Sequence, residues 1–277
     1  MPRIAICAPS TSFTRADAGR VAELAAAEFP QIDLSFHEQC FAEEGHFAGP
    51  DAQRLAALLE CANDPAFDAV WFVRGGYGAV RVAADAVRQM NASARTKHYL
   101  GYSDAGTLLG ALYRHGIGRP VHAPMPADIR RTGGEDAVRR SLGWLAGSRD
   151  GVAAGIDKRP VVAFNLMTLA MLAGTDLMPD LSGHEVMVEE VSEHLYAVDR
   201  LLFHVTAHLA AAGVAGLRIG RVSDVPENDR PFGSDPVAMA QYWCERTGIP
   251  ILGLADIGHD SANRIVPFGL ADWWRRQ

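Results

Sequence analysis

The strongest constraint on the fold is a regular alternation of strand and helix patterns over residues 1–125. Short apolar segments with strand character are separated by longer segments in which apolar residues recur at helical spacing. Strands that alternate with helices in this way form βαβ units, which build a mainly parallel sheet with helices on both faces. We therefore predict an α/β fold. The apolar segments are RIAICA, IDLSF, FDAVWFV, HYLGY and RPVHAP, and the helical segments span 16–27, 51–61, 79–90 and 106–115.

The rest of the chain differs in pattern, which indicates a second domain. A chain of 277 residues is long for one core, because single cores seldom grow beyond about 250 residues. A polar segment with several Arg and Gly residues follows the alternating region, and beyond it short strand patterns mix with helical patterns at 165–173, 195–209 and 235–247. We predict a parallel-sheet domain over 1–125, a mostly helical linker over 126–159, and a smaller mixed α/β domain with a small barrel or curled sheet over 160–277.

Composition and charge narrow the kind of partner. With 48% hydrophobic and 21% charged residues, the chain has the composition of a soluble globular protein. A formal net charge of -7 without a long basic run argues against binding a phosphate backbone. The apolar run at 161–174 is shorter than the roughly 20 residues that span a bilayer, and the first residues lack the roughly 7 to 15 apolar residues of a signal-peptide core. We expect a cytoplasmic protein that acts on a small molecule or peptide, without nucleic-acid or membrane partners.

Ser103 lies in GYSDAG, where a strand pattern passes directly into a helix pattern. Gly101 permits a sharp turn, and a serine there can project its hydroxyl above the sheet while the amide of Asp104 points at the same space. That geometry would suit a nucleophile beside half of an oxyanion hole. The alternative is that Ser103 or Asp104 caps the helix, and this stretch alone favours the cap. It is not the GxSxG elbow, because Ala105 stands where that motif has its second glycine.

The loop RGGYG, residues 74–78, follows the strand that ends at Val73 and holds three glycines in four positions. Its backbone amides can approach a ligand closely or turn through positive φ. The spacing matches neither GxGxxG nor a P-loop. We interpret the loop as the source of an amide donor for an oxyanion, and a simple tight turn remains equally open.

A reactive serine needs a base, which near neutral pH is usually histidine. Of the ten histidines, His259 in DIGHDSANRIVPFG is the most suggestive, because Gly258 and polar loop residues would leave its ring accessible. His122 precedes the turn APMP at the sheet edge, and His184 offers no obvious partner. A loop histidine with an ordinary structural role is the alternative for His259.

Glu189 and Glu190 lie in the alternating segment EVMVEEV, so their side chains point to opposite faces of an extended strand. One of them can face inwards, where a buried carboxylate needs a hydrogen-bonded or cationic partner such as an imidazolium. A surface glutamate, or a structural pair with Arg200, is the alternative that this segment alone favours.

Together these stretches resemble the LD-carboxypeptidases of serine peptidase family S66, which include muramoyltetrapeptide carboxypeptidases and the related microcin C7 self-immunity peptidases. The resemblance covers almost the whole chain in the right order. Its segments are IAICAPSTSF, FDAVWFVRGGYGAVR, YLGYSDAGTLLGALY, VHAPM, FNLMTLAMLAGTDLMPDLSGHEVMVEEVSEHLYAVDRLL and DIGHDSANRIVPFG.

The resemblance implies a catalytic triad with Ser103 as nucleophile, Glu189 as carboxylate and His259 as base. It also implies an oxyanion hole from the backbone amides of Asp104 and Gly76. The family fold pairs an N-terminal flavodoxin-like domain, also described as class I glutamine-amidotransferase-like, with a smaller C-terminal swivelling barrel domain, and its active site lies between them.

The substrate implied by the resemblance is a murein tetrapeptide that loses its C-terminal D-alanine during cytoplasmic peptidoglycan recycling. We expect Arg74, Gly75 and Tyr77 to contact it, and either Arg74 or Arg130 to bind the terminal carboxylate. A homodimer is implied as well, and no metal or cofactor. The four cysteines, which form no CxxC pair, likewise indicate no zinc site and no disulfide framework.

Two other functions remain open. Within the same chemistry, the chain would act on aminoacyl-nucleotide conjugates of the microcin type, with Trp144 as a candidate to stack on the base. From another class, it would be a non-catalytic flavodoxin-like module whose RGGYG and APSTS loops hold a small anion.

The chain departs from the family pattern at three places. AFNL at 163–166 replaces the common Gly-Gly-Asn-Leu, Ala123 replaces a Gly, and Gly106 intervenes before Thr107. These changes leave the triad positions intact and bear on the substrate pocket.

Overall fold

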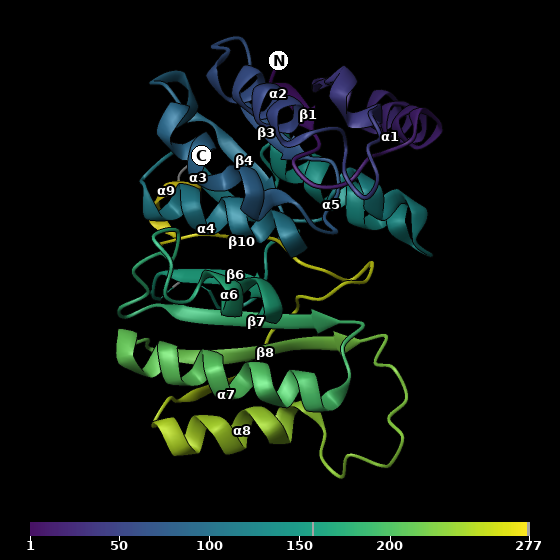
Figure 1. Cartoon of the computed structure of the whole chain (residues 1–277). Coiled ribbons are helices and arrows are strands. Elements are labelled where there is room, and N and C mark those ends of the chain that lie inside the picture. The colour runs from purple at the N-terminus through teal and green to yellow at the C-terminus, as the bar shows by residue number, and fades with distance from the viewer. Residues whose placement is uncertain (157, 276–277) are drawn as a thin grey trace.

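The computed structural model describes residues 1–156 and 158–275. Position 157 of the predicted linker and positions 276–277 of the predicted C-terminal domain lie outside the described residues. The chain forms two sheets with helices packed on them (Figure 1). Among the described helices, none combines the length and apolar character needed to cross a membrane.

The first sheet has six strands in the order β10-β5-β4-β3-β1-β2. Neighbours among β1 to β5 run parallel, and β10 is antiparallel to β5. All four residues of β3 are buried, as expected for a parallel strand covered on both faces. The strands are β1 (Arg3–Cys7), β2 (Asp33–Phe36), β3 (Ala69–Phe72), β4 (His98–Gly101), β5 (Arg119–His122) and β10 (Val266–Pro267).

The predicted helices of the alternating region are present. Thr14 begins the first of them by accepting a hydrogen bond from the amide of Asp17, as an N-cap does. The α-helices are α1 (Arg15–Glu28), α2 (Asp51–Asn63), α3 (Ala79–Gln89), α4 (Gly106–Arg114) and α5 (Gly134–Leu145). Short 3-10 helices lie at η1 (Glu38–Phe41), η2 (Ser93–Thr96), η3 (Ser103–Ala105) and η4 (Pro126–Arg130).

The second sheet has four parallel strands in the order β6-β7-β8-β9. In Figure 1 helix α7 lies along this sheet, and α8 lies on the far side of α7. The strands are β6 (Val161–Asn165), β7 (Glu185–Val191), β8 (Gly216–Ser223) and β9 (Ile251–Leu254), and the helices are α6 (Leu166–Leu172), α7 (Leu195–Ala212), α8 (Pro236–Thr247) and α9 (Asp272–Arg275).

The segment RIVPFG was expected among the strands of the C-terminal region, and the structure corrects this. Val266 pairs with His122, so β10 adds to the first sheet. It contacts both β5 and β6, and Figure 1 shows it beside β6. Gly269 forms a further antiparallel bridge to Val161. The end of the chain therefore joins the two sheets, because its buried apolar residues complete a core that both sheets share.

The two sheets are also joined by close packing of α4 on α6. A Cβ atom at Gly110 of α4 would lie 2.9 Å from Cδ1 of Leu172 and 3.3 Å from Cε1 of Phe164. Glycine is needed there because a side chain would push the helices apart. Within the segment predicted as a linker, η4 and α5 pack against α1.

Candidate active site

Ser103 lies two residues after the end of β4 and has a φ of 60°. A serine in this left-handed region stores backbone strain of about 1–3 kcal/mol, and such residues cluster at functional sites. Neither η3 nor α4 has a side-chain cap, so Ser103 does not serve as one. Its carbonyl oxygen accepts a hydrogen bond from Oγ1 of Thr168 at 3.3 Å, which ties the turn to α6.

Asp104 does cap a helix, but not the one that follows it. Its Oδ2 accepts hydrogen bonds from Oγ of Ser10 at 2.5 Å and from the amide of Ala79, the first residue of α3, at 2.9 Å. Burial raises the pKa of this carboxyl group. The side chain therefore fixes the turn against two neighbouring loops, which leaves the backbone amide of Asp104 as its contribution beside Ser103.

The RGGYG loop lies against Ser103. A Cβ atom at Gly75 would lie 2.9 Å from both Cβ and Oγ of Ser103, so only glycine permits this approach. Oγ1 of Thr11 donates a hydrogen bond of 2.7 Å to the carbonyl of Gly75. In a trans peptide the next N–H points the opposite way, so the amide of Gly76 is directed away from Thr11. That amide has no hydrogen-bond partner among the residues described.

His259 and Glu189 form a buried pair. Nδ1 of His259 lies 2.5 Å from Oε2 of Glu189, and the two residues are 7% and 1% exposed. Because a buried carboxylate accepts, Nδ1 carries the proton, and Nε2 is left to accept one. The His259 ring packs 4.9 Å from the ring of Tyr102, measured between centroids. Glu189 lies on β7 and His259 follows β9, so the second sheet brings them together.

Glu190 points to the opposite face of β7, as its alternation with Glu189 predicted. Its carboxylate accepts hydrogen bonds from Nδ2 of Asn165 at 2.6 Å and from the amides of Met167 and Val191 at 2.8 and 2.9 Å. Burial raises its pKa. These bonds anchor the start of α6, so Glu190 has a structural role. The alternative pairing of Glu189 with Arg200 is not formed within the described chain, where the Arg200 guanidinium lies over the ring of Tyr196.

His122 is buried and supports the His259 loop. Its Nε2 lies 3.0 Å from Oδ1 of Asn263, which also accepts the amide of Gly258 at 3.2 Å. Burial lowers the pKa of His122 to about 4, so the ring is neutral near pH 7. Asn263 was not singled out from the sequence, and its place after DIGHDS was the only signal that could have found it.

The prediction that His184 has no obvious partner is wrong. Its Nε2 accepts the hydroxyl of Tyr113 at 2.8 Å, and its Nδ1 donates to the carbonyl of Ser182 at 3.0 Å. Both ring nitrogens are therefore engaged in structural hydrogen bonds away from Ser103.

Ser103 and His259 line one cavity of about 530 Å³, although no direct hydrogen bond joins them. The described residues with positive φ other than glycine are Ser103, Ser192 and Asp224, and all of them line this cavity. Gly75 and Gly76 line it as well. The wall of this cavity therefore contains the strained backbone positions, the Gly76 amide and the His259 ring, together with the Ser103 hydroxyl.

Three arginines line this cavity, and they differ in their partners. Nε of Arg130 lies 2.6 Å from Oδ2 of Asp17, and Nε of Arg131 lies 3.0 Å from Oδ1 of Asp128. Arg74 has no acidic partner within the described chain, and its one hydrogen bond is a long contact of 3.5 Å to the carbonyl of Ser12. Desolvation lowers its pKa, with a smaller effect of Arg130, but an arginine stays charged at neutral pH.

A second cavity, of about 420 Å³, also includes Ser103 and Gly76 in its wall. Tyr77, the third residue expected to contact substrate, lines this cavity and not the first. The predicted contact residues are therefore divided between two hollows that meet at Ser103.

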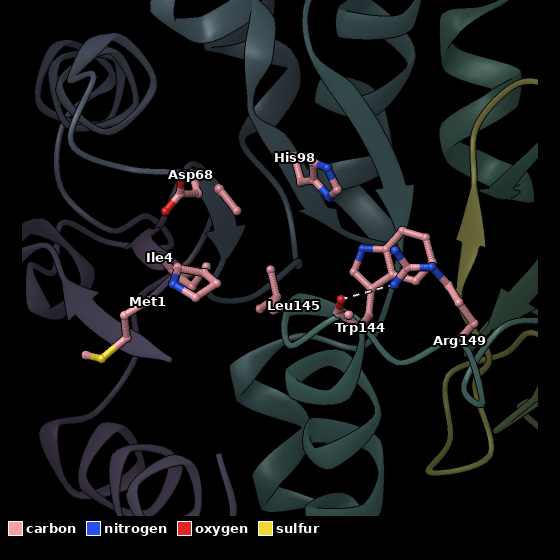
Figure 2. A pocket seen from close by; sticks show the side chains of 10 residues that line it. Met1, Ile4, Asp68, His98, Trp144, Leu145 and Arg149 are labelled. Carbon is pink, nitrogen blue, oxygen red and sulfur yellow. Dashed lines mark hydrogen bonds between the residues drawn. The ribbon is translucent and has the colours of Figure 1, made fainter. Parts of the chain in front are cut away.

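A third cavity, of about 390 Å³, is shown in Figure 2. It lies at the end of the first sheet where the parallel strands begin, opposite the end that carries Ser103. His98, which begins β4, and Ile4 of β1 line it, whereas Ser103 follows the end of β4. Trp144 lies here, 3% exposed, with the Arg149 guanidinium 4.1 Å above its ring. The prediction that Trp144 could stack on a nucleotide base is wrong, because the indole is buried at the end of the sheet where the strands begin, away from Ser103.

Within residues 1–156 and 158–275, no group of three or more His, Cys, Asp or Glu side chains is placed to hold a metal ion. The four cysteines are buried and free.

Comparison with known proteins assigns the family. Residues 4–123 match the model of the LD-carboxypeptidase N-terminal domain, and residues 160–271 match that of the LD-carboxypeptidase C-terminal domain. A murein tetrapeptide carboxypeptidase of Pseudomonas aeruginosa is 26% identical over 291 residues, which cover 96% of this chain and 91% of the relative.

Solved structures agree with this assignment. The muramoyltetrapeptide carboxypeptidase from Oxalobacter formigenes superposes with a TM-score of 0.76 at 25% identity, covering 96% of this chain and 92% of that one. The microcin C7 self-immunity protein MccF superposes with a TM-score of 0.78 at 15% identity, covering 97% and 91%, which is a likeness of fold. The chain belongs to peptidase family S66, the LD-carboxypeptidases.

Proposed function

We propose that this protein is a serine carboxypeptidase that cleaves the amide bond between an L-configured centre and a C-terminal D-amino acid. Its substrate is a murein tetrapeptide, from which it releases D-alanine. The observation that carries the proposal is the buried hydrogen bond between Nδ1 of His259 and Glu189, with the His259 ring in the cavity that Ser103 lines.

In this mechanism Oγ of Ser103 attacks the scissile carbonyl carbon while Nε2 of His259 takes the hydroxyl proton. Glu189 holds the ring in the tautomer with a proton on Nδ1 and stabilises the imidazolium that forms. His259 then gives the proton to the leaving amine, and a water molecule releases the acyl group by the same steps. His259 and Ser103 must close to hydrogen-bond distance on substrate binding, as such contacts often tighten in the complex.

The negative oxygen of the tetrahedral intermediate is received by the backbone amides of Asp104 and Gly76. Donors of this kind each contribute about 100- to 1000-fold to the rate. The hydrogen bond from Thr11 to the carbonyl of Gly75 supports this role, because it fixes the direction of the Gly76 amide before substrate arrives.

Recognition of a C-terminal carboxylate is assigned to Arg74. Arg130 was the other candidate, but its guanidinium is held by Asp17. Among the described residues no acid pairs with Arg74, which lines the cavity together with Gly75 and Gly76. A charge-assisted bond to a carboxylate is stronger than a neutral one. The substrate itself is inferred from the relatives named murein tetrapeptide carboxypeptidase and muramoyltetrapeptide carboxypeptidase.

Several finer features belong to the same proposal. The parallel order β2-β1-β3-β4-β5 supports a flavodoxin-like first domain, since flavodoxin has this order. Four further features remain predictions: a swivelling C-terminal domain, the boundaries at 1–125, 126–159 and 160–277, a homodimer, and a cytoplasmic location.

The aminoacyl-nucleotide function has weaker support. It depends on the likeness of fold to MccF. Trp144, the residue proposed to stack on the base, lies at the end of the sheet away from Ser103. A non-catalytic anion-binding module would have no use for the buried Glu189–His259 pair.

The test is to incubate the purified protein with L-Ala-D-Glu-meso-diaminopimelate-D-Ala and to measure free D-alanine. We expect release by the wild type and almost none by Ser103→Ala. Undiminished release by that variant would rule out the nucleophile. Hydrolysis of an aminoacyl-nucleotide amide with the tetrapeptide left intact would select the other function.

A further inference from the structure

His259 lies on a loop, residues 255–265, that connects the two sheets. The loop follows β9 of the second sheet and leads into β10, which pairs with β5 of the first sheet. Glu189 lies on β7 of the second sheet, whereas Ser103 lies beyond the end of β4 in the first. His259 must therefore be held in place relative to two partners that belong to different sheets.

Contacts with the second sheet hold His259 beside Glu189. The guanidinium of Arg221 on β8 pairs with both carboxylate oxygens of Asp260, and the amide of Arg221 donates to the carbonyl of Ile257 at 2.9 Å. Strand β8 pairs with β7, which carries Glu189. Residues close to His259 on either side in the chain are thus bound to the strand next to Glu189.

Arg140 holds the same loop from the side of the first sheet. Its Nη1 donates hydrogen bonds to the carbonyls of Ser261 at 3.1 Å and Asn263 at 2.7 Å. Arg140 lies on α5, which is tied to the first sheet because Oγ of Ser141 donates at 2.7 Å to the carbonyl of Pro124, two residues after the end of β5. Arg140 therefore joins the His259 loop to the sheet that positions Ser103.

The surroundings of Arg140 are fitted to this contact. Within the described chain, the hydrogen bonds of its guanidinium go to these two carbonyls, and no acid forms an ion pair with it. A Cβ atom at Gly151 would collide with Cγ of Arg140 and lie 3.1 Å from its Cδ, so glycine makes room for the stem. The neutral ring of His122 binds the side chain of Asn263, whereas Arg140 supplies charge-assisted bonds to the loop backbone, which are stronger than neutral ones.

We propose that Arg140 is a positioning residue that keeps the His259 imidazole within reach of the Ser103 hydroxyl. The inference rests on the proposed function and adds a residue that acts through His259. Arg140 is not among the described residues that line the two cavities at Ser103, so its loss should leave substrate binding unchanged. Because a misplacement of 1 Å costs about 100-fold in rate, removal of its two hydrogen bonds should lower kcat about 10- to 100-fold.

The test measures kcat and KM for release of D-alanine from L-Ala-D-Glu-meso-diaminopimelate-D-Ala. Arg140→Met keeps an unbranched stem over Gly151 and removes the donors, and we expect it to lower kcat about 10- to 100-fold with KM unchanged. Arg140→Lys should keep more of kcat, because an ammonium group also donates to carbonyl oxygens. Arg139→Met is the matched control, since Arg139 is the preceding residue of the same helix and pairs with Glu28. It should keep the wild-type kcat.

A second measurement separates positioning from general support of the loop. The proton on Nδ1 of His259, in its hydrogen bond to Glu189, is followed by its low-field resonance in proton NMR. We expect this resonance to be the same in Arg140→Met and in the wild type, because the contacts of Arg221 with Asp260 and Ile257 remain. Loss of the resonance in Arg140→Met would overturn the inference, because Arg140 would then support the whole loop.

Failure of this inference can be told apart from failure of the proposed function. Wild-type kcat in folded Arg140→Met, or an equal fall of kcat in Arg139→Met, would overturn the inference and leave the proposed function standing. Equal kcat in Arg140→Lys and Arg140→Met would also overturn it, because the hydrogen bonds would then not matter. A wild type that releases no D-alanine would overturn the proposed function and this inference with it.

Discussion

Replacement of Gly75 by alanine should displace the nucleophile without unfolding the protein. The new Cβ would lie 2.9 Å from both Cβ and Oγ of Ser103, whereas ordinary contact begins at 3.4 Å, so the groups must separate by about 0.5 Å. Since a 1 Å misplacement costs about 100-fold in rate, we expect kcat for D-alanine release to fall about 10- to 100-fold. Overpacking of this kind lowers the free energy of unfolding by about 1–3 kcal/mol.

The assay is D-alanine release at saturating tetrapeptide, together with Tm from calorimetry. Gly19→Ala is the matched control, because a Cβ at Gly19 in α1 meets nothing within 4 Å. It should keep full kcat and gain stability, since alanine favours a helix over glycine by about 0.5–1 kcal/mol. Wild-type kcat in folded Gly75→Ala would refute the contact between this loop and the nucleophile.

Three further predictions follow from the same geometry. Glu189→Gln should lower kcat by about 10³- to 10⁴-fold, because a neutral amide cannot hold the imidazolium, and single-turnover acylation measured with the tetrapeptide checks this. Arg74→Ala should raise KM more than Arg130→Ala does, and the difference should vanish for a peptide whose terminal carboxylate is amidated. As pH falls from 6.5 to 4, His122 should lower the free energy of unfolding by about 3 kcal/mol. The reason is that His122 is protonated in the unfolded chain over this range, whereas in the folded chain its pKa of about 4 keeps it neutral. Tm against pH should therefore be flatter in His122→Gln than in the wild type, and parallel curves would contradict that cause.

The local patterns of the first half of the chain determine its architecture. Apolar strands of four or five residues and helices between them give β1 to β5 and α1 to α4 close to the predicted bounds. The Gly-rich loop and the Ser103 turn were found because both follow strands at one edge of the sheet. These features depend on neighbours in the sequence, which pattern analysis can read.

Contacts between segments far apart in the sequence could not be predicted from local patterns. Alternation placed Glu189 and Glu190 on opposite faces of β7, but which face meets a histidine depends on a loop 70 residues further on. Likewise, the bond from His122 to Asn263 spans 141 residues. The pairing of β10 with β5 was missed for the same reason, since two residues carry too little pattern to show which sheet they join.

The role of Trp144 shows a different limit. A tryptophan in a polar, helical segment suggests an exposed ring, yet the indole is buried against the rings of His98, Trp273 and Trp274, with the Arg149 guanidinium above it. Helical periodicity can identify the apolar face of α5 but not the partner that covers it.

The central claim is that Ser103 is a nucleophile activated by His259 and Glu189. The most direct measurement is the rate at which a serine-directed fluorophosphonate labels Ser103, followed by peptide mass spectrometry in the wild type and in His259→Ala. The account predicts one adduct, on Ser103, in the wild type and labelling slower by orders of magnitude in the variant. An enzyme that releases D-alanine while Ser103 stays unlabelled, or equal labelling of Ser103 in both proteins, would contradict it.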